Sequence, residues 1–198
     1  TVKVGVPYEI TTTVGQDYSF LVWTHNGEEG VVEFADATAI STTMTVTQEV
    51  GDVLIAPTFD RRPYPVTWDP YSGNTGVYTN KTITLTFNEA VDATTVTLGE
   101  GESVEVSTWS QTGGAEAAAN PEHIEDNLTM SVDGSVVTLS PIPGLWFNPY
   151  HAVLVELRET ITDAGGNTMA EPFSWFFYTG AGRDSAAPVL TRYAILRN

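Results

Sequence analysis

Hydrophobic and polar residues alternate with a period of two along short segments of the chain. Along residues 151–157 the strongest apolar positions are every second residue, and along residues 173–178 large aromatic residues repeat in the same way. Successive side chains of a β-strand point to opposite faces, so each set lies on one face of a sheet. The Asp-Ala-Gly-Gly-Asn sequence of residues 163–167 has turn chemistry. A hairpin-like pair is predicted, whose apolar face needs a second layer; its two sets are Val153, Val155 and Leu157, and Phe173, Trp175 and Phe177.

The segment before this pair predicts the second layer. Residues 81–87 alternate Thr with Ile, Leu and Phe, and Asp133-Gly134 is a strong signal for a two-residue hairpin turn. With the opening pair this makes about seven strands, the number expected of an immunoglobulin-like sandwich. The further expected strands are residues 94–98, 103–107, 127–132 and 135–139.

Residues 3–60 predict a separate small β unit. Strand-length segments alternate there with Gly, Asn and Asp turns. In residues 18–23 both faces carry apolar side chains, which predicts a central strand covered on both sides. Prolines and charges at residues 61–65 mark the boundary with the second unit. The other expected strands are residues 8–14, 31–34, 42–46 and 52–55.

Residues 109–126 interrupt the alternation and predict a surface insertion. The alanine-rich part can hold one helical turn, with Asn120 as N-cap and Pro121 at the first helical position. Trp109 opens the insertion and precedes small polar residues, so we expect it to be exposed. It is the ligand-contacting candidate of the chain, because exposed aromatic rings stack on sugars.

Composition supports an all-β protein and excludes some partners. Thr and Val are abundant, and both favour strands. A net charge of -17 and a pI of about 4.2 argue against binding to nucleic acid. Cys is absent, which excludes disulfides and Cys-ligated zinc, and no apolar run is long enough to span a bilayer. The chain begins at Thr1 without a leader pattern, so we expect a processed or excised fragment.

Four segments carry a resemblance to a known family. Residues 82–92 read Thr-Ile-Thr-Leu-Thr-Phe-Asn-Glu-Ala-Val-Asp, and residues 162–179 contain Thr-Asp-Ala-Gly-Gly-Asn-Thr-Met followed by Trp-Phe-Phe-Tyr-Thr. With residues 136–141 and 150–157, they make residues 64–180 resemble the bacterial Ig-like domain first described in surface-layer proteins. Ala90, where the family usually has Pro, and the insertion depart from the pattern.

The first unit carries a second resemblance. Residues 15–23 contain Gly-Gln-Asp-Tyr-Ser-Phe-Leu-Val-Trp, followed by a Thr-rich strand at residues 42–46 and Asp52 to Phe59. Residues 3–60 thereby resemble a divergent internalin-type B-repeat.

The resemblances imply a domain plan and a role. We expect a B-repeat-like domain at residues 1–62, an Ig-like sandwich at 63–180, and a linker or first strand of a following domain at 181–198. They imply a non-catalytic spacer or adhesive module of a bacterial cell-surface or secreted protein, in contact with other domains of its polypeptide and with cell-wall or host glycans or proteins. The alternative is a carbohydrate-binding accessory module of a secreted polysaccharide-active protein.

Candidate chemistry is sparse, and neither a cofactor nor a metal is expected. Glu100, Glu102 and Glu105 surround a Gly-rich turn, which suits a solvated loop better than a calcium site. A hydrolase using Glu102 or Glu105 is the third hypothesis and the least favoured. The three histidines lack metal-ligand spacing and are expected at the surface.

Three further features have a structural and a chemical interpretation. Asp163 and Asn167 suit a turn better than a cation site. Residues 146–150 (Trp-Phe-Asn-Pro-Tyr) are expected to pack on the sandwich edge rather than to bind sugar. Lys81 is expected at a solvated strand end, with cross-linking to an Asn or Asp as the alternative.

Overall fold

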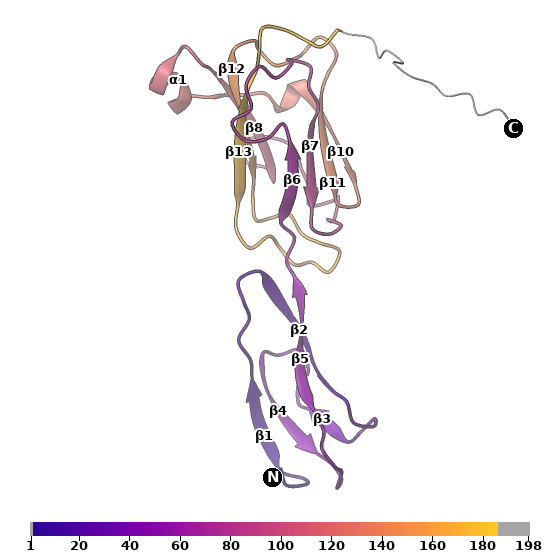
Figure 1. The fold of residues 1–198 in the computed structure, drawn as a ribbon. Helices are drawn as coiled ribbons and strands as arrows, with labels where there is room; N and C mark the ends of the chain where they lie inside the picture. Colours follow the sequence, from indigo (N-terminus) through magenta and orange to yellow (C-terminus); the bar gives the residue numbers. More distant parts are fainter. Residues whose placement is uncertain (1, 186–198) are drawn as a thin grey trace, which may run out of the picture.

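The protein consists of two β units arranged end to end in an elongated molecule (Figure 1). The computed structural model describes residues 2–185. Strands β1 to β5 form the N-terminal unit and β6 to β13 the C-terminal unit. The expected first strand of a following domain, within residues 186–198, lies outside the described residues. In the described part of the chain, no helix has the length and hydrophobicity to cross a membrane.

The N-terminal unit contains two small antiparallel sheets. One has the strand order β1-β4-β3, and the other pairs β2 with β5. Trp23 and Val31 are buried within this unit, and its aromatic contacts join Phe20 to Trp23 and to Phe59. The strands are β1 (Pro7–Thr11), β2 (Tyr18–His25), β3 (Val32–Phe34), β4 (Ser41–Val46) and β5 (Ile55–Arg61).

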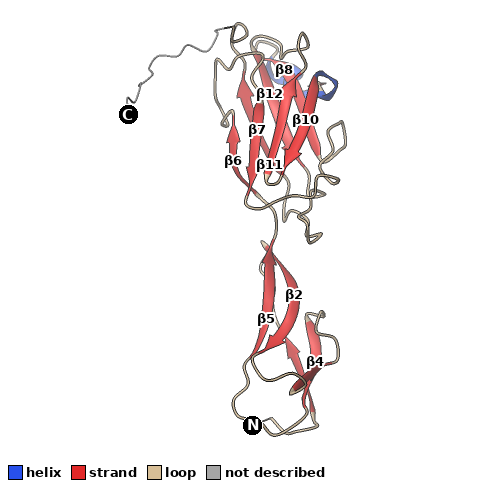
Figure 2. Ribbon diagram, turned by 90° about the vertical axis from the view of Figure 1, so that its right-hand side faces the viewer, coloured by secondary structure: helices blue, strands red, loops and turns tan. Residues whose placement is uncertain are grey.

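Two expectations for this unit were wrong. Strand β2 is not central, because it pairs only with β5. Its register shifts between Phe20 and Val22, so strict alternation fails and Leu21 is exposed. The last strand begins at Ile55 rather than at Asp52, and it continues to Arg61 at the entrance of the C-terminal unit (Figure 2).

The C-terminal unit is an antiparallel β-sandwich, which confirms the all-β, Ig-like fold. One sheet has the order β10-β11-β7-β6 and the other β13-β12-β8-β9. The strands are β6 (Pro65–Asp69), β7 (Ile83–Phe87), β8 (Val104–Ser110), β9 (Glu122–His123), β10 (Leu128–Asp133), β11 (Val136–Pro141), β12 (His151–Leu157) and β13 (Phe173–Tyr178).

The predicted alternating pair forms the centre of the core. Strands β12 and β13 are antiparallel, with Val155 opposite Trp175 and Val153 opposite Phe177. All four side chains are buried against apolar residues of β7 and β11. Burial of a large apolar side chain contributes about 1.5–3 kcal/mol, so this row stabilises the sandwich strongly.

Residues 94–98 do not form the predicted strand. The Asp92 carboxylate accepts hydrogen bonds from the backbone N–H and the hydroxyl of Thr94, at 2.9 and 2.7 Å. This local side-chain cap gives the backbone a turn in place of a ladder. Two short edge strands, β6 and β9, were not predicted, because neither has a clear alternation of its own.

The insertion contains helix α1 (Gly114–Ala119), followed by the short 3-10 helix η1 (Glu125–Asn127). Asn120 ends α1 as its C-cap, so its predicted role as N-cap was wrong. The alanine-rich run is the better helix former, whereas Pro121 lacks the N–H needed to continue the helix.

Candidate functional site

The outer face of the β13-β12-β8-β9 sheet brings aromatic side chains from two strands into one row. Ala152 lies opposite Trp109 on one side and opposite Tyr178 on the other. Their neighbours Val153 and Phe177 are buried in the core, so by alternation these three point away from it. Ala152 is 0% exposed although it faces outward, which means that the larger side chains around it cover it.

The next row continues this surface. Leu154 lies opposite both Ser107 and Phe176, and Phe176 is 37% exposed. The Phe176 and Tyr178 rings meet edge to face, with centroids 5.5 Å apart. Trp109 is half-buried rather than fully exposed. We call the three rings of Trp109, Phe176 and Tyr178 the aromatic face. Sequence alternation alone could have placed Phe176 and Tyr178 outward, but strand pairing was needed to bring them beside Trp109.

A polar network borders the aromatic face at the β8–β9 edge. Glu105 is 9% exposed and forms an ion pair with Arg158. His123 Nδ1 lies 3.3 Å from Glu125 Oε1 and 3.9 Å from Glu105 Oε1. The other Glu125 contact is structural, because Glu125 Oε1 accepts the backbone N–H of Val106 at 2.8 Å. The network holds the short strand β9 against β8.

The network shifts two pKa values in opposite directions. The hydrogen bond to Glu125 raises the pKa of His123, helped by the nearby carboxylate charges and opposed by burial. Burial by itself would raise the pKa of Glu105, but the hydrogen bond and charge of Arg158 leave that pKa below its usual value. Both shifts favour the charged forms that the ion pairs need.

The three glutamates of the Gly-rich turn do not converge on one cation. Glu102 accepts a hydrogen bond from the Thr97 hydroxyl at 2.7 Å, whereas Glu105 points to Arg158. The expectation that Glu105 is solvated was wrong, because pairing in the sheet covers it.

The Trp146–Tyr150 segment divides between the core and the surface. Phe147 is buried and packs edge to face on Phe177, as expected. Trp146 lies under the guanidinium of Arg183, 4.6 Å from the ring centroid. Tyr150 was expected to pack on the edge, but it is 58% exposed and has a positive φ of 57°. Gly144 forms the bend that precedes this segment.

Lys81, which was expected at a solvated strand end, forms a surface ion pair with Asp69.

A second cluster, which the sequence did not predict, lies at the junction of the two units. Asp60 comes from the end of β5, Glu89 follows β7, and Asp163 begins the β12–β13 turn. Their carboxylate oxygens lie within 4.8 Å of one another, and Asp163 is only 3% exposed. We call these residues the junction carboxylates. Asp60 lies in the last residues of β5 and Glu89 just after β7, whereas Asp163 lies in the long β12–β13 connection, and the three are far apart in sequence.

Asparagine side chains hold the junction carboxylates together. The Asn167 amide donates to Asp60 Oδ2 at 2.9 Å and to Asp163 Oδ2 at 2.7 Å. Asn88 donates to Glu89 at 2.9 Å and accepts the Tyr64 N–H at 2.7 Å. The predicted turn role of Asp163 and Asn167 is present, since the Asn167 N–H donates to Asp163 Oδ1 at 2.9 Å.

Holding three carboxylates this close together costs free energy of folding, and this cost is reflected in the pKa of Glu89. Burial raises the pKa of Glu89, and the charges of Asp163 and Asp60 raise it further, against a lowering by the Asn88 hydrogen bond and by Arg61. Within residues 2–185, this is the one group of three or more side chains with the spacing of metal ligands. Carboxylate and amide oxygens suit hard cations such as calcium, which takes six to eight oxygen ligands.

Basic side chains lie at the outer rim of the junction. Arg62 Nη1 donates to the carbonyl and hydroxyl of Thr168, at 3.4 and 3.3 Å. The Arg61 guanidinium stacks on Tyr64, 4.5 Å from the ring centroid. A cavity of about 250 Å³ lies beside them, lined by residues of both units.

Comparison with known proteins gives the family of the C-terminal unit. The model of the bacterial Ig-like domain family matches residues 60–179, more than half of the chain. The chain belongs to the bacterial Ig-like domain family. The match covers both the aromatic face and the junction carboxylates of this Ig-like domain. The B-repeat resemblance of the N-terminal unit remains a prediction.

Other comparisons add little to the Ig-like assignment. The crystal structure of CopC from Methylosinus trichosporium OB3b is similar at 12% identity, with a TM-score of 0.39. That similarity covers 60% of this chain and 93% of the CopC chain. No curated protein matches the chain.

Proposed function

We propose that this Ig-like protein is a non-catalytic spacer of a bacterial cell-surface or secreted protein, which holds neighbouring domains of its own polypeptide apart. The observation that carries this proposal is the end-to-end arrangement of the two units. Strand β5 ends at Arg61 and β6 begins at Pro65, so only three residues separate them. A linker this short, with prolines at both ends of residues 63–65, limits bending.

Hydrogen bonds across the junction support the same proposal. Asn167 joins the β12–β13 turn to Asp60, and Arg62 joins the linker to Thr168. Asn88 Nδ2 also donates to the Arg62 carbonyl at 3.4 Å. These contacts support one preferred orientation of the two units, which a spacer requires.

The experiment is a measurement of interdomain distance by pulsed electron spin resonance. The chain has no cysteine, so Ile40→Cys and Tyr78→Cys at exposed positions in the two units give a clean labelled pair. A narrow distance distribution supports the spacer. Asn167→Ala should broaden it, whereas Asn120→Ala, on the distant insertion, should leave it unchanged. A broad distribution in the otherwise unaltered chain contradicts the proposal.

Carbohydrate recognition is a second candidate, favoured by the aromatic face. Trp109 and Tyr178 flank a small residue in one row, with Phe176 beside them, which gives a partly exposed apolar surface of the kind on which pyranose rings stack. The ligand class is a neutral or cationic glycan, because the protein carries a net charge of -17.

Affinity electrophoresis in soluble cell-wall and plant polysaccharides tests this candidate. Retardation by a polysaccharide that Trp109→Ala or Phe176→Ala weakens about two- to tenfold in affinity supports this candidate, since one aromatic contact contributes about 0.5–1.5 kcal/mol. Tyr18→Ala removes an exposed ring from the other unit and serves as the matched control. Equal mobility of the parent chain with and without every polysaccharide excludes it.

A further inference from the structure

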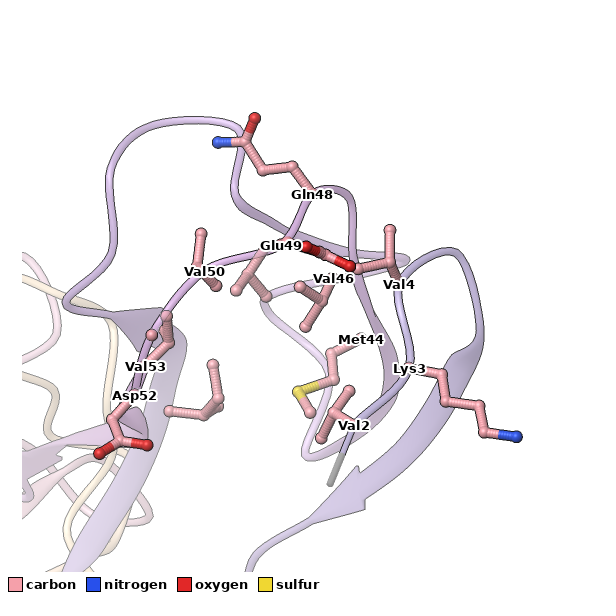
Figure 3. Close-up of a pocket in the computed structure, with 13 residues that line it drawn as sticks. Val2, Lys3, Val4, Met44, Val46, Gln48, Glu49, Val50, Asp52 and Val53 are labelled. Carbon is pink, nitrogen blue, oxygen red and sulfur yellow. The ribbon is translucent and has the colours of Figure 1, made fainter.

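A groove beside the N-terminus lacks the side chains on which a sugar stacks. It has a volume of about 770 Å³, and Met44, Val46 and Val50 are among the residues that line it (Figure 3). None of the described residues of this lining is aromatic. Because aromatic rings provide the stacking surface for a pyranose, the glycan candidate belongs to the aromatic face of the Ig-like sandwich and not to this groove.

The aromatic face has a spacing that fits one class of glycan. Trp109 and Tyr178 lie on the two strands that flank β12, with Ala152 between them. Neighbouring strands lie about 4.8 Å apart, so these two residues are separated by about 10 Å across the sheet. In an extended β-1,4-linked glycan every second sugar presents the same face, and the repeat of two sugars matches this separation. Two sugars of such a chain can therefore stack on the two rings, whereas an α-1,4-linked chain curves away from a flat row.

An exposed carboxylate lies on the same side of the sheet as the rings. Glu156 is opposite Glu105, and Val155 beside it is buried in the core, so Glu156 points outward. It lies two residues along β12 from Leu154, the apolar residue opposite Phe176, which is a distance of about 7 Å. Glu156 is exposed, and the ion pair of Glu105 is made with Arg158. The Glu156 carboxylate is therefore open to a ligand on the aromatic face.

The polar border of the aromatic face carries a negative charge. Its carboxylates are those of Glu100, Glu105, Glu125 and Glu156, and its basic side chains are those of Arg158 and His123. Four negative charges against two positive ones give -2 when His123 is charged, and against one positive charge they give -3 when it is neutral. Such a border attracts an ammonium group. An ammonium group above an aromatic ring also gains a cation–π interaction.

We propose that the aromatic face binds a β-1,4-linked glycan whose sugars carry free amines, as in a polymer of glucosamine. Two sugars stack on Trp109 and Tyr178, and the ammonium group of a sugar above Phe176 approaches Glu156. One row of the sheet separates Phe176 from Glu156, and a sugar with its amine spans that row. This inference rests on the glycan candidate, to which it adds the linkage and the charge of the ligand.

Isothermal titration calorimetry of the full chain with three hexasaccharides tests the proposal. Glucosamine hexaose and cellohexaose share the β-1,4 linkage and differ in charge, whereas cellohexaose and maltohexaose share their sugar and differ in linkage. We expect glucosamine hexaose to bind most tightly, cellohexaose less tightly and maltohexaose most weakly. Added salt should weaken the affinity for glucosamine hexaose and leave that for cellohexaose unchanged, because salt screens only the charged contact.

Three variants separate stacking from charge. Phe176→Ala, at an exposed position, should weaken the binding of both β-1,4-linked hexaoses about two- to tenfold. Glu156→Gln should weaken the binding of glucosamine hexaose alone, about two- to fivefold. Glu171→Gln is the matched control, because it removes an exposed carboxylate beside the junction of the two units and changes the net charge by the same amount.

The outcomes distinguish this inference from the glycan candidate on which it rests. Equal affinity for glucosamine hexaose and cellohexaose, or for cellohexaose and maltohexaose, overturns the inference and leaves the glycan candidate standing. The same effect of Glu156→Gln and Glu171→Gln on glucosamine hexaose also overturns it, because the cation is then attracted by the overall charge of the protein. A lack of binding to all three hexaoses overturns both.

Discussion

The side-chain amide of Asn167 donates a hydrogen bond to Asp60 Oδ2 at 2.9 Å, although 107 residues separate them in the chain. Asp60 lies in β5, one residue before that strand ends at Arg61, and Asn167 closes the β12–β13 turn of the Ig-like sandwich. The same amide also donates to Asp163, so one side chain ties a turn to itself and to the other unit. The family's Asp-Ala-Gly-Gly-Asn turn therefore also serves as the contact between the two units.

Replacement of Asn167 should destabilise the junction. Asn167→Ala removes the donor shared by two carboxylates, and we expect a loss of about 1–3 kcal/mol in the free energy of unfolding of the C-terminal unit. Asn167→Asp should cost more at neutral pH, because it adds a fourth negative charge. Urea unfolding followed by tryptophan fluorescence measures both. Equal stability of Asn167→Asp and the parent chain would show that the carboxylates do not repel one another.

The free energy of unfolding should depend on pH through Glu89, one of the junction carboxylates. Its pKa is raised in the folded protein, so the folded state holds the proton more tightly than the unfolded state. This contribution to stability is complete below the unfolded pKa of about 4.5 and is lost as pH rises through the folded pKa. Glu89→Gln should remove this dependence and raise stability at pH 7. The measurement is urea unfolding between pH 4 and 8, with Glu122→Gln, an exposed residue on β9, as control.

The β8–β9 edge should show a pH dependence of its own. The pKa of His123 is raised, so its contribution is complete below about pH 6.5 and is lost as pH rises through the folded pKa. The pKa of Glu105 is lowered, so its contribution is present above about 4.5 and is lost as pH falls through the folded pKa. The protection factors of the β9 amides, measured by hydrogen exchange and NMR, should be highest between these two pH limits. His123→Gln should abolish the loss of protection above the upper pH limit and leave the loss below the lower pH limit unchanged.

Two adjacent phenylalanines of β13 provide a matched pair for the sandwich core. Phe177 is fully buried, and Phe177→Ala should cost about 3–5 kcal/mol by leaving a cavity. Phe176 points to the opposite face and is partly exposed, so Phe176→Ala should cost clearly less. Urea unfolding of both variants checks the difference. Similar losses would mean that the strand does not alternate as described.

The Trp175 indole gives a prediction about a single hydrogen bond. Its Nε1 donates to the carbonyl of Pro70 at 3.0 Å in a buried place. Trp175→Phe retains most of the ring but leaves that carbonyl without its donor, which should cost about 1–3 kcal/mol. Urea unfolding of this variant should show a lower midpoint and an unchanged m-value.

The sandwich could be predicted from the sequence because its signals are local. Alternation along residues 151–157 and 173–178 identifies which side chains face the core, and the Asp133-Gly134 turn identifies a hairpin. Where a local interaction competes with alternation, prediction failed. The Asp92 cap replaces a strand, and the register shift beside Leu21 exposes a residue that alternation would cover.

Trp109 was predicted as a ligand-contacting residue from the sequence alone, but the other two rings of the aromatic face, Phe176 and Tyr178, were not. Tyr178 becomes its neighbour only because Ala152 pairs with both strands. The junction carboxylates show the same limit more strongly, since no local pattern relates Asp60 to Asp163.

The order of residues by itself determined the β-sheet character, the inward and outward faces of the main strands, and the strongly acidic charge. Each of these depends on neighbours within a few positions, where backbone geometry is nearly the same in every protein. The tertiary structure alone decided which strands pair, where the two units meet, and which distant side chains share a site. Those outcomes depend on packing between segments many residues apart, so no single segment contains them.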